Sequence, residues 1–331
     1  MATVKKGSPA RVEAGSKDKS SEAVQKAPGA RLRMGTIGCQ LSFDGISLRR
    51  AIGEEFKQTA AEAIETSADD LSATYRLFAK EDLSEVHSCK QAIKAYWRSY
   101  TLPYTEIGVR LLPHAQLEQF RQGLVPMVGN FLAAVVSLQE KMPEIKARRK
   151  EKLGSLYDAG NYPDNVRTEF SVELTYPSLE PPNYLMKLDP KLYQEEVARV
   201  REQMSQAAVL AETVFAAEML KVVTGLRESV NNVAQGKQRW FRDATANHVF
   251  EVLAEFQQKL LPFGIAADGP LQQCLQDLKK VVGNYTEKSL PAALRSEPQF
   301  RDQVVSQFAK IQEGLSELIE TRTVMRRRVV R

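Results

Sequence analysis

The stretch DPKLYQEEVARVREQMSQAAVLAETVFAAEMLKVVTGLRESVNNVAQG, residues 189–236, contains no proline after Pro190. Its apolar side chains recur every three or four positions, a spacing that places them on one face of a helix. They are Val197, Val200, Met204, Ala207, Ala208, Ala211, Val214 and Phe215. At a rise of about 1.5 Å per residue such a helix approaches ~65 Å, which exceeds a compact domain. The stretch therefore predicts an elongated helical bundle, or a break near Gly225 or Asn231-Asn232.

Helical spacing continues on both sides of this stretch. After it, the pattern predicts helices at about 238–261, 270–284 and 298–324. Before it, the predicted helices lie at about 47–66, from Ser67 onward, 82–100 with a capping box formed by Asp82 and Glu85, 113–142 with a kink at Pro126, and from Pro143 to about 154 or 158.

Two segments alternate apolar and polar residues, the period of a half-buried strand. Ile37, Cys39, Leu41 and Phe43 define the first, and the second runs from about Phe170 to Tyr176. We expect these strands to pair with each other. The predicted fold class is therefore mainly α, an elongated helical bundle with a small two-stranded β element.

The charge is concentrated at the two ends of the chain. Residues 1–33 hold eight Lys or Arg and three Asp or Glu, and residues 322–331 hold five Arg and no acid. The rest of the chain carries 33 basic and 38 acidic residues. We expect a disordered basic tail at 1–33, a helical region with the β element at 34–188, a long-helix bundle at 189–321 and a basic C-terminal end at 322–331.

The sequence points to a reducing compartment without a membrane span. Cys39, Cys89 and Cys274 are odd in number and widely spaced, which argues against a disulfide framework. The most apolar stretch, 123–138, is shorter than the ~20 residues of a transmembrane helix and predicts a buried helix. We expect a cytoplasmic protein, in the host cytoplasm if phage-encoded, and no membrane partner.

Patterns that support catalysis are not apparent in the sequence. Gly35-Thr36-Ile37-Gly38 lacks the lysine and the spacing of a phosphate-binding loop. His114 and Glu118 share a helical face, but a metal site needs three or four ligands. We expect no catalytic residue, no metal and no cofactor, and a protein that is not an enzyme.

Basic clusters are the positive finding, because several charges on one surface bind phosphates and interleaved aromatics stack on bases. Trp240 is either such a stacking platform or a core anchor, as we expect for Trp97, and the C-terminal arginines either reach phosphates or dock on the protein's own acidic body. The nucleic-acid-binding candidates are Arg326, Arg327, Arg328, Arg331, Lys146, Arg148, Arg149, Lys150, Arg239, Trp240 and Arg242.

One central segment carries a family pattern. It consists of Thr101-Leu102-Pro103-Tyr104, Gly108-Val109-Arg110-Leu111-Leu112-Pro113, Leu153-Gly154, Leu156-Tyr157, Tyr162-Pro163 and Phe170-Ser171. This pattern, over roughly residues 100–185, resembles a family of uncharacterised proteins of tailed bacteriophages and related mobile elements. Asn161 stands where similar proteins often have Asp. Genes that neighbour such proteins sometimes encode recombination functions or MoxR-type AAA ATPases, which implies a replication, recombination or ATPase-adaptor setting.

Within that segment Arg110 stands out, because it lies between apolar neighbours in a turn shaped by Pro103, Gly108 and Pro113. We expect it to pair with a buried carboxylate or to cap helix carbonyls; ligand binding is the alternative.

Together these features predict a non-catalytic phage or mobile-element accessory protein that binds nucleic acid or a partner protein. The partners would be DNA or RNA, an AAA ATPase or another phage protein. The alternative is a structural, oligomer-forming phage protein, in which the long helices supply contacts between copies of a homo-oligomer.

Overall fold

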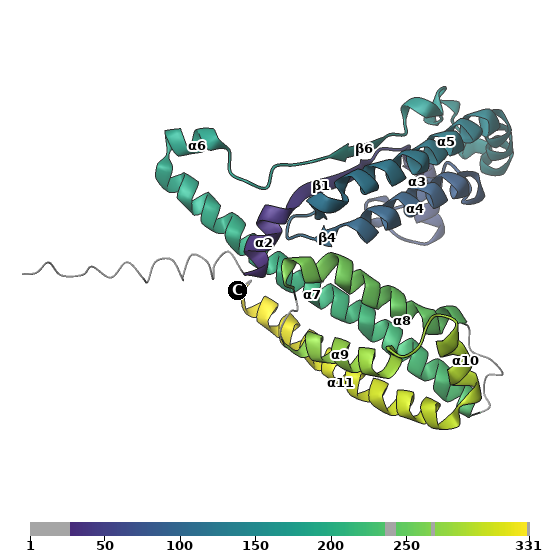
Figure 1. Cartoon of the computed structure of the whole chain (residues 1–331). Helices are drawn as coiled ribbons and strands as arrows, with labels where there is room; N and C mark the ends of the chain where they lie inside the picture. Colours follow the sequence, from purple (N-terminus) through teal and green to yellow (C-terminus); the bar gives the residue numbers. More distant parts are fainter. Residues whose placement is uncertain (1–26, 236–242, 266–268, 330–331) are drawn as a thin grey trace, which may run out of the picture. The chain divides into compact units, whose positions relative to one another are not determined.

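The computed structural model describes residues 27–235, 243–265 and 269–329, except the side chains of residues 233–234 and 323–329. The chain forms two compact units (Figure 1). The first, here the sheet unit, comprises Ile37–Thr101 and Glu106–Pro177. The second, here the helical unit, takes Leu102–Thr105 and the described parts of Met1–Thr36 and Ser178–Arg331. The predicted boundary at residue 188 is therefore misplaced, and the N-terminal segment belongs with the C-terminal helices.

The mainly helical class is confirmed, and α7, Pro190–Ala234, is the axis of the helical unit. It runs without the break considered near Gly225. Side chains of the expected stripe, such as Met204 and Phe215, are buried, whereas Val214 remains partly exposed. Around α7 lie α6 (Asn183–Leu188), α8 (Asp243–Glu255), α9 (Pro270–Val282), α10 (Ser289–Ser296) and α11 (Pro298–Val329). α10 was not among the predicted helices.

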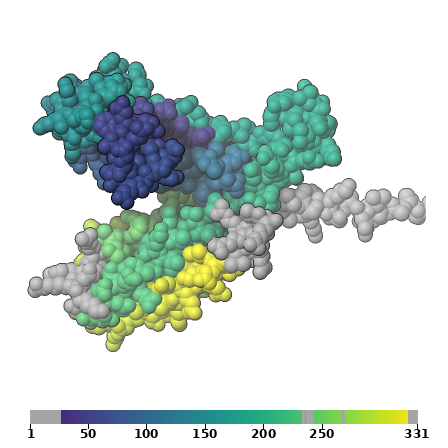
Figure 2. All heavy atoms as spheres, turned by 180° about the vertical axis from the view of Figure 1, so that it is seen from behind, coloured from purple at the N-terminus to yellow at the C-terminus, as the bar shows by residue number. Residues whose placement is uncertain are grey.

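α11 packs along α7, and α9 packs on α11. Figure 2 shows the yellow side chains of α11 beside the green ones of α7. In such a helical bundle, each helix buries its apolar stripe against its neighbours.

A short N-terminal helix also belongs to this unit. α2, Pro28–Gly35, packs against α7, and its Leu32 is fully buried. A Cβ atom added at Gly29 would lie 2.8 Å from Ser205 Oγ, so glycine allows the two helices to approach closely. Order therefore begins before the predicted Met34, because one leucine and one small residue suffice to dock this helix.

α8 ends in an irregular turn. It continues as a π-helix, Phe256–Leu260, and a 3-10 helix, Leu261–Phe263. Pro262 has no N–H to donate, and the Ile265 amide instead donates to the Leu260 carbonyl at 3.2 Å. Gly264 then takes a left-handed φ of 65°, as glycine readily does.

The chain forms a four-stranded sheet in the order β4-β5-β1-β6, so the β element is larger than the predicted pair; β5, β6 and all of β1 but Thr36 belong to the sheet unit. The expected pairing of β1 with β6 is confirmed; the pair is antiparallel, with Leu41 opposite Leu174 and Phe43 opposite Val172. The strands are β1 (Thr36–Phe43), β4 (Leu102–Pro103), β5 (Val109–Pro113) and β6 (Val172–Thr175). Core-facing side chains of β1, β5 and β6 pack in one cluster with those of α4 (Ser84–Tyr100) and α5 (Leu117–Leu153).

α5 is one helix where two were expected, since Pro126 and Pro143 both lie inside it. An interior proline costs about 3 kcal/mol. Buried residues on both sides, among them Leu124, Phe131 and Ile145, continue the same packed stripe across each proline. That packing holds the helix together despite the missing backbone bonds.

Residues 47–77 differ most from expectation. They form the strands β2, Arg49–Ala51, and β3, Thr74–Arg76, which pair antiparallel, and of the two expected helices only the first is present, shortened to Glu54–Ala63. Between them lie α3, Glu54–Ala63, and the 3-10 turn Ala68–Asp70, where Ser67 accepts from the Asp69 amide. β3 lies in a short apolar and polar alternation that the helical interpretation overlooked, whereas β2 has no such alternation.

Five more 3-10 turns connect the elements of the sheet unit: Glu81–Leu83, His114–Gln116, Gly154–Leu156, Ala159–Asn161 and Val166–Thr168. The first replaces the predicted capping box, because Asp82 accepts from the Ala79 amide and does not cap α4.

One helical run in the described chain, His114–Leu156, is long and apolar enough to cross a membrane by length and composition alone, a test that core helices of soluble proteins also pass. Of its most apolar window 28% is buried. The predicted buried helix at 123–138 thus presents only one face to the core, and Val125 and Leu132 are exposed.

Candidate nucleic-acid interface

The basic residues at the C-terminal end of α5 differ in whether they form ion pairs. Lys146 and Arg148 form ion pairs with Asp164 and Asp82, respectively. Lys150, like the neighbouring Lys152, is exposed and has no ion pair with a described residue. Only the last two therefore offer uncompensated charge to a ligand.

Arg149 must be removed from the surface set, because its side chain is only 6% exposed. It follows Met142 and Ile145 at three- and four-residue spacing and so occupies a core position of the helix. One guanidinium nitrogen, Nη2, donates to the backbone carbonyl of Arg76 on β3. Nε has no hydrogen-bond partner among the described residues, and no described carboxylate lies within ion-pair distance.

Tyrosines surround this buried cation. Tyr162 donates its hydroxyl to the Leu77 carbonyl at 3.0 Å, and Asn161 donates to the Tyr75 hydroxyl at 3.1 Å. Burial raises the pKa of Tyr162, while its hydrogen bond with Arg149 acts in the opposite direction. These two bonds tie β3 and the residue after it to the segment at Asn161 and Tyr162 that follows α5.

β2 and β3 bring two further arginines to this end of the sheet unit. Arg49 lies directly opposite Arg76 in the strand register. Both side chains are exposed, and neither has an ion pair with a described residue. Arg50, one position on, points to the other face of the strand pair.

The sequence analysis missed Arg49 and Arg76 because it placed them in helices. The signal that would have found β3 is the alternation of Leu71, Ala73, Tyr75 and Leu77 with Ser72, Thr74 and Arg76. Four basic side chains on three elements thus have no ion pair with a described residue: Arg49, Arg76, Lys150 and Lys152, with β3 bonded to α5 through Arg149 and the Arg76 carbonyl. We call them the basic surface.

The other candidates of the sequence analysis are not placed by the structure. Arg239, Trp240, Arg242 and Arg331 lie outside the described residues. Arg326, Arg327 and Arg328 lie in the backbone of α11, but their side chains are outside the described set.

The first arginine of the C-terminal cluster is placed, and it docks on the protein itself. Arg322 Nη2 lies 2.9 Å from Glu212 Oε2 on α7, and the Glu212 side chain is 9% exposed. For this arginine the docking alternative is therefore confirmed.

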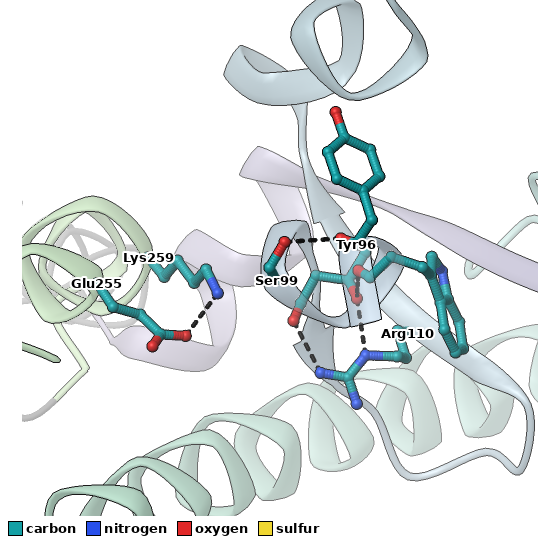
Figure 3. Close-up of polar contacts among 7 residues, drawn as sticks. Tyr96, Ser99, Arg110, Glu255 and Lys259 are labelled. Atoms are coloured by element: carbon teal, nitrogen blue, oxygen red, sulfur yellow. Dashed lines mark hydrogen bonds and ion pairs between the residues drawn. The ribbon is translucent and has the colours of Figure 1, made fainter. Parts of the chain in front are cut away.

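Arg110 caps a helix, one of the two roles expected for it (Figure 3). Its Nε donates to Thr101 Oγ1 at 2.7 Å and its Nη2 to the Thr101 carbonyl at 2.8 Å. Thr101 is the C-cap of α4, and the guanidinium also lies 5.6 Å from the Trp97 ring centroid. The half-buried Trp97 packs against the core cluster and donates to Cys39.

Figure 3 also shows a buried lysine in the helical unit. Lys259, in the π-helix, lies 2.5 Å from Glu255 one turn earlier. Because the carboxylate compensates the ammonium, this pair is a local structural contact.

Metal chemistry has no visible support in the described part of the chain. No group of three or more His, Cys, Asp or Glu side chains there lies close enough to hold an ion. His114 and Glu118 belong to no such group.

Comparisons of the chain with protein-family models, with curated proteins and with solved structures found no match.

Proposed function

We propose that this chain is a non-catalytic accessory protein of a phage or mobile element that binds nucleic acid through the basic surface and the C-terminal arginines. The observation that carries the proposal is that Arg49 and Arg76 lie opposite each other, and that neither they nor Lys150 and Lys152 have an ion-pair partner in the described chain. Uncompensated Lys and Arg bind phosphates by displacing condensed counterions, whatever the base sequence.

The setting rests on the resemblance of residues 100–185 to phage and mobile-element proteins. It favours a role in replication or recombination, or as an adaptor of an AAA ATPase, in the host cytoplasm. A partner protein with an acidic surface would use the same charges.

Salt-dependent binding tests the proposal. Fluorescence anisotropy of a labelled DNA duplex would be measured with the full chain at two or more salt concentrations. Arg326, Arg327, Arg328 and Arg331 would be replaced together by Ala, and Lys150 and Lys152 by Ala in a second variant. Each lost phosphate contact should reduce the log–log salt slope by about 0.9.

The matched control removes two lysines that are exposed elsewhere, Lys187 and Lys288 in the helical unit. This variant has the same net charge as the Lys150/Lys152 variant and should bind like the parent. If the parent does not bind at low salt, nucleic-acid binding is excluded and a protein partner or self-assembly is left. If the parent binds and all variants bind equally, the basic surface and the C-terminal arginines are excluded as the binding residues.

The second candidate is a structural, oligomer-forming protein, and one observation favours it. α6 and the first turn of α7 expose the apolar side chains of Tyr184, Met186, Leu188 and Leu192. Apolar surface that gathers on one element marks a contact with another protein. Sedimentation velocity would test this: Leu188→Asp should dissociate a homo-oligomer, whereas Ile107→Asp, at an exposed apolar residue of the β4–β5 turn, should not.

A further inference from the structure

The strand pair β2–β3 has a feature that its charge alone does not explain. Backbone bonds run from the Leu77 amide to the Leu48 carbonyl and from the Ile52 amide to the Ala73 carbonyl, both 3.0–3.1 Å. These bonds alternate along an antiparallel pair, so Arg49 and Arg76 occupy a non-hydrogen-bonded position between them. At such positions the side chains start closest, with Cβ atoms about 4.5–5.5 Å apart.

Two like charges that face each other across strands repel and lower stability. Neither arginine is relieved by a carboxylate of the described chain. The buried guanidinium of Arg149 adds a third positive charge near Arg76, because it donates to the backbone carbonyl of Arg76 at the outer edge of β3. Its Nε is left without an acceptor in the described structure.

Three guanidinium groups without a neighbouring carboxylate create a positive local potential that favours the binding of an anion. Exposed guanidiniums are forked donors that match the oxygens of a phosphate and bind it in bidentate fashion. Because Arg49 and Arg76 start from adjacent positions on one face, a single phosphate can accept from both.

We propose that Arg49 and Arg76 jointly bind one phosphate group of a nucleic-acid backbone, and that Arg149 is the positioning residue that holds β3, and with it Arg76, against α5. This inference rests on the proposed function and deepens it, since it names the group that is bound and the residues that share it.

The salt slope of duplex DNA binding distinguishes a shared phosphate from two separate ones. Arg49→Gln or Arg76→Gln alone weakens binding but leaves the slope close to the parental value, because the remaining arginine still neutralises the phosphate. The double variant lowers the slope by about 0.9, the amount for one phosphate. A loss of about 0.9 in each single variant and about 1.8 in the double variant would overturn the proposal.

The matched control is the double variant Arg50→Gln, Arg98→Gln. Both residues are exposed, and Arg50 lies beside Arg49 on the same strand but on the other face. This control removes the same net charge and should keep the parental slope. An equal loss of slope in the control would show that only net charge matters and would also overturn the proposal.

Inorganic phosphate separates this inference from the proposed function. Thermal unfolding of the full chain would be followed with phosphate replacing chloride at constant pH and ionic strength. A rise in the parental Tm of about 2 °C or more that the Arg49/Arg76 variant loses and the control keeps supports the shared site even if no DNA binds. In that case the nucleic-acid function fails and the ligand is a free phosphate or phosphate ester.

A second outcome is that the salt slope of DNA binding falls only in the Arg49/Arg76 double variant, while inorganic phosphate leaves the Tm unchanged. This outcome supports the shared site and limits its ligand to the phosphates of a polymer. DNA binding whose slope the double variant leaves unchanged supports the proposed function and overturns the shared site.

The positioning role of Arg149 has its own readout. Arg149→Met keeps the apolar stem but loses the donor to Arg76. It should weaken duplex binding while leaving the salt slope parental, because no phosphate contact is removed. A parental affinity in a folded Arg149→Met protein contradicts the positioning role.

Discussion

Arg149 illustrates how a single residue can belong to the core and to the charge of a surface at once. Burying an unpaired cation is costly, and the effective penalty is several kcal/mol per ion. The structure reduces that cost with the Arg76 carbonyl and the Tyr162 hydroxyl but supplies no described carboxylate. The contribution of Arg149 to stability must therefore come from its packed stem.

Two substitutions at this position should separate packing from charge. Arg149→Ala removes the stem and should lower the free energy of unfolding by about 2–4 kcal/mol. Arg149→Met keeps the stem and should stay within about 1 kcal/mol of the parent, since apolar replacement of a buried charge is often neutral. Urea unfolding measures both. An equal loss in the two variants would show that the guanidinium itself stabilises the fold.

Because Arg49 and Arg76 face each other across β2 and β3, replacing one of them should increase the stability of the protein. Arg49→Gln should raise the free energy of unfolding by about 0.2–1 kcal/mol in low-salt buffer without phosphate, because it removes a cross-strand repulsion. The gain should vanish near 1 M salt, where the Debye length is about 3 Å. Arg50→Gln, opposite Tyr75, should show no such salt dependence. A loss of stability at low salt in Arg49→Gln would contradict the repulsion.

Tyr96 gives the sheet unit a pH dependence at alkaline pH. Burial raises the pKa of Tyr96 to about 12, and the hydrogen bond with Tyr100 and its charge act in the same direction. Unfolded tyrosine loses its proton near pH 10. The folded state therefore keeps a proton that the unfolded chain has released, and the stability linked to Tyr96 is present below about pH 10 and lost as the pH rises toward 12.

Tyr96→Phe should consequently lose stability less steeply than the parent between about pH 10 and 12. Denaturant midpoints across that range would measure the slope. The exposed Tyr184 supplies the control, since Tyr184→Phe should leave the slope unchanged. Identical slopes in the parent and in Tyr96→Phe would count against the linkage.

The elements that were easiest to predict are those in which a regular apolar pattern continues over many residues. α7 and α11 repeat one apolar stripe over many turns, and β1 and β6 each alternate over several residues. β2 and β3 have three residues each, too few for local pattern to outweigh the neighbouring helical spacing. The prediction for α5 was wrong for the opposite reason. Local rules treat an interior proline as a kink or a helix end, but continuous packing holds α5 together across both Pro126 and Pro143.

The N-terminal helix α2 was missed because its eight residues contain only two large apolar side chains, Leu32 and Met34. We predict that Leu32→Ala lowers the free energy of unfolding of the helical unit by about 2–5 kcal/mol, since Leu32 is fully buried. Met34→Ala in the same helix should change it by no more than about 0.5 kcal/mol, because Met34 is 61% exposed. Limited proteolysis should cut before Pro28. Cleavage between Pro28 and Met34 would refute the docking of α2.

On the scale of the whole molecule, the candidate site could be predicted only in part. Local sequence showed that the end of α5 is basic, but Lys146 and Arg148 are compensated by Asp164 and Asp82, 18 and 66 residues away. Such pairings depend on tertiary structure. For the same reason Arg49 and Arg76 became neighbours only when the strands paired.

The helical unit holds the start of the C-terminal cluster through a buried carboxylate. Glu212→Ala should lower the free energy of unfolding by about 3 kcal/mol, because it removes the acceptor of Arg322. The double variant with Arg322→Ala should recover part of that loss, since no unpaired cation remains. Chemical denaturation of the four proteins completes the cycle. Strict additivity of the two single losses would mean that the pair does not interact.

The position of α2 in the chain has a consequence for how the protein is made. Its packing partners are Ser205 and Phe263, which follow Gly29 and Gly35 by 176 and 228 residues. At about 5–20 residues per second a ribosome needs roughly 10–50 s to reach the second partner. A helix of eight residues is unstable alone in water. The α2 segment therefore stays available to chaperones, processing enzymes or a second chain while the entire sheet unit emerges, and it can dock fully only after α7 and the turn at Phe263 have been made.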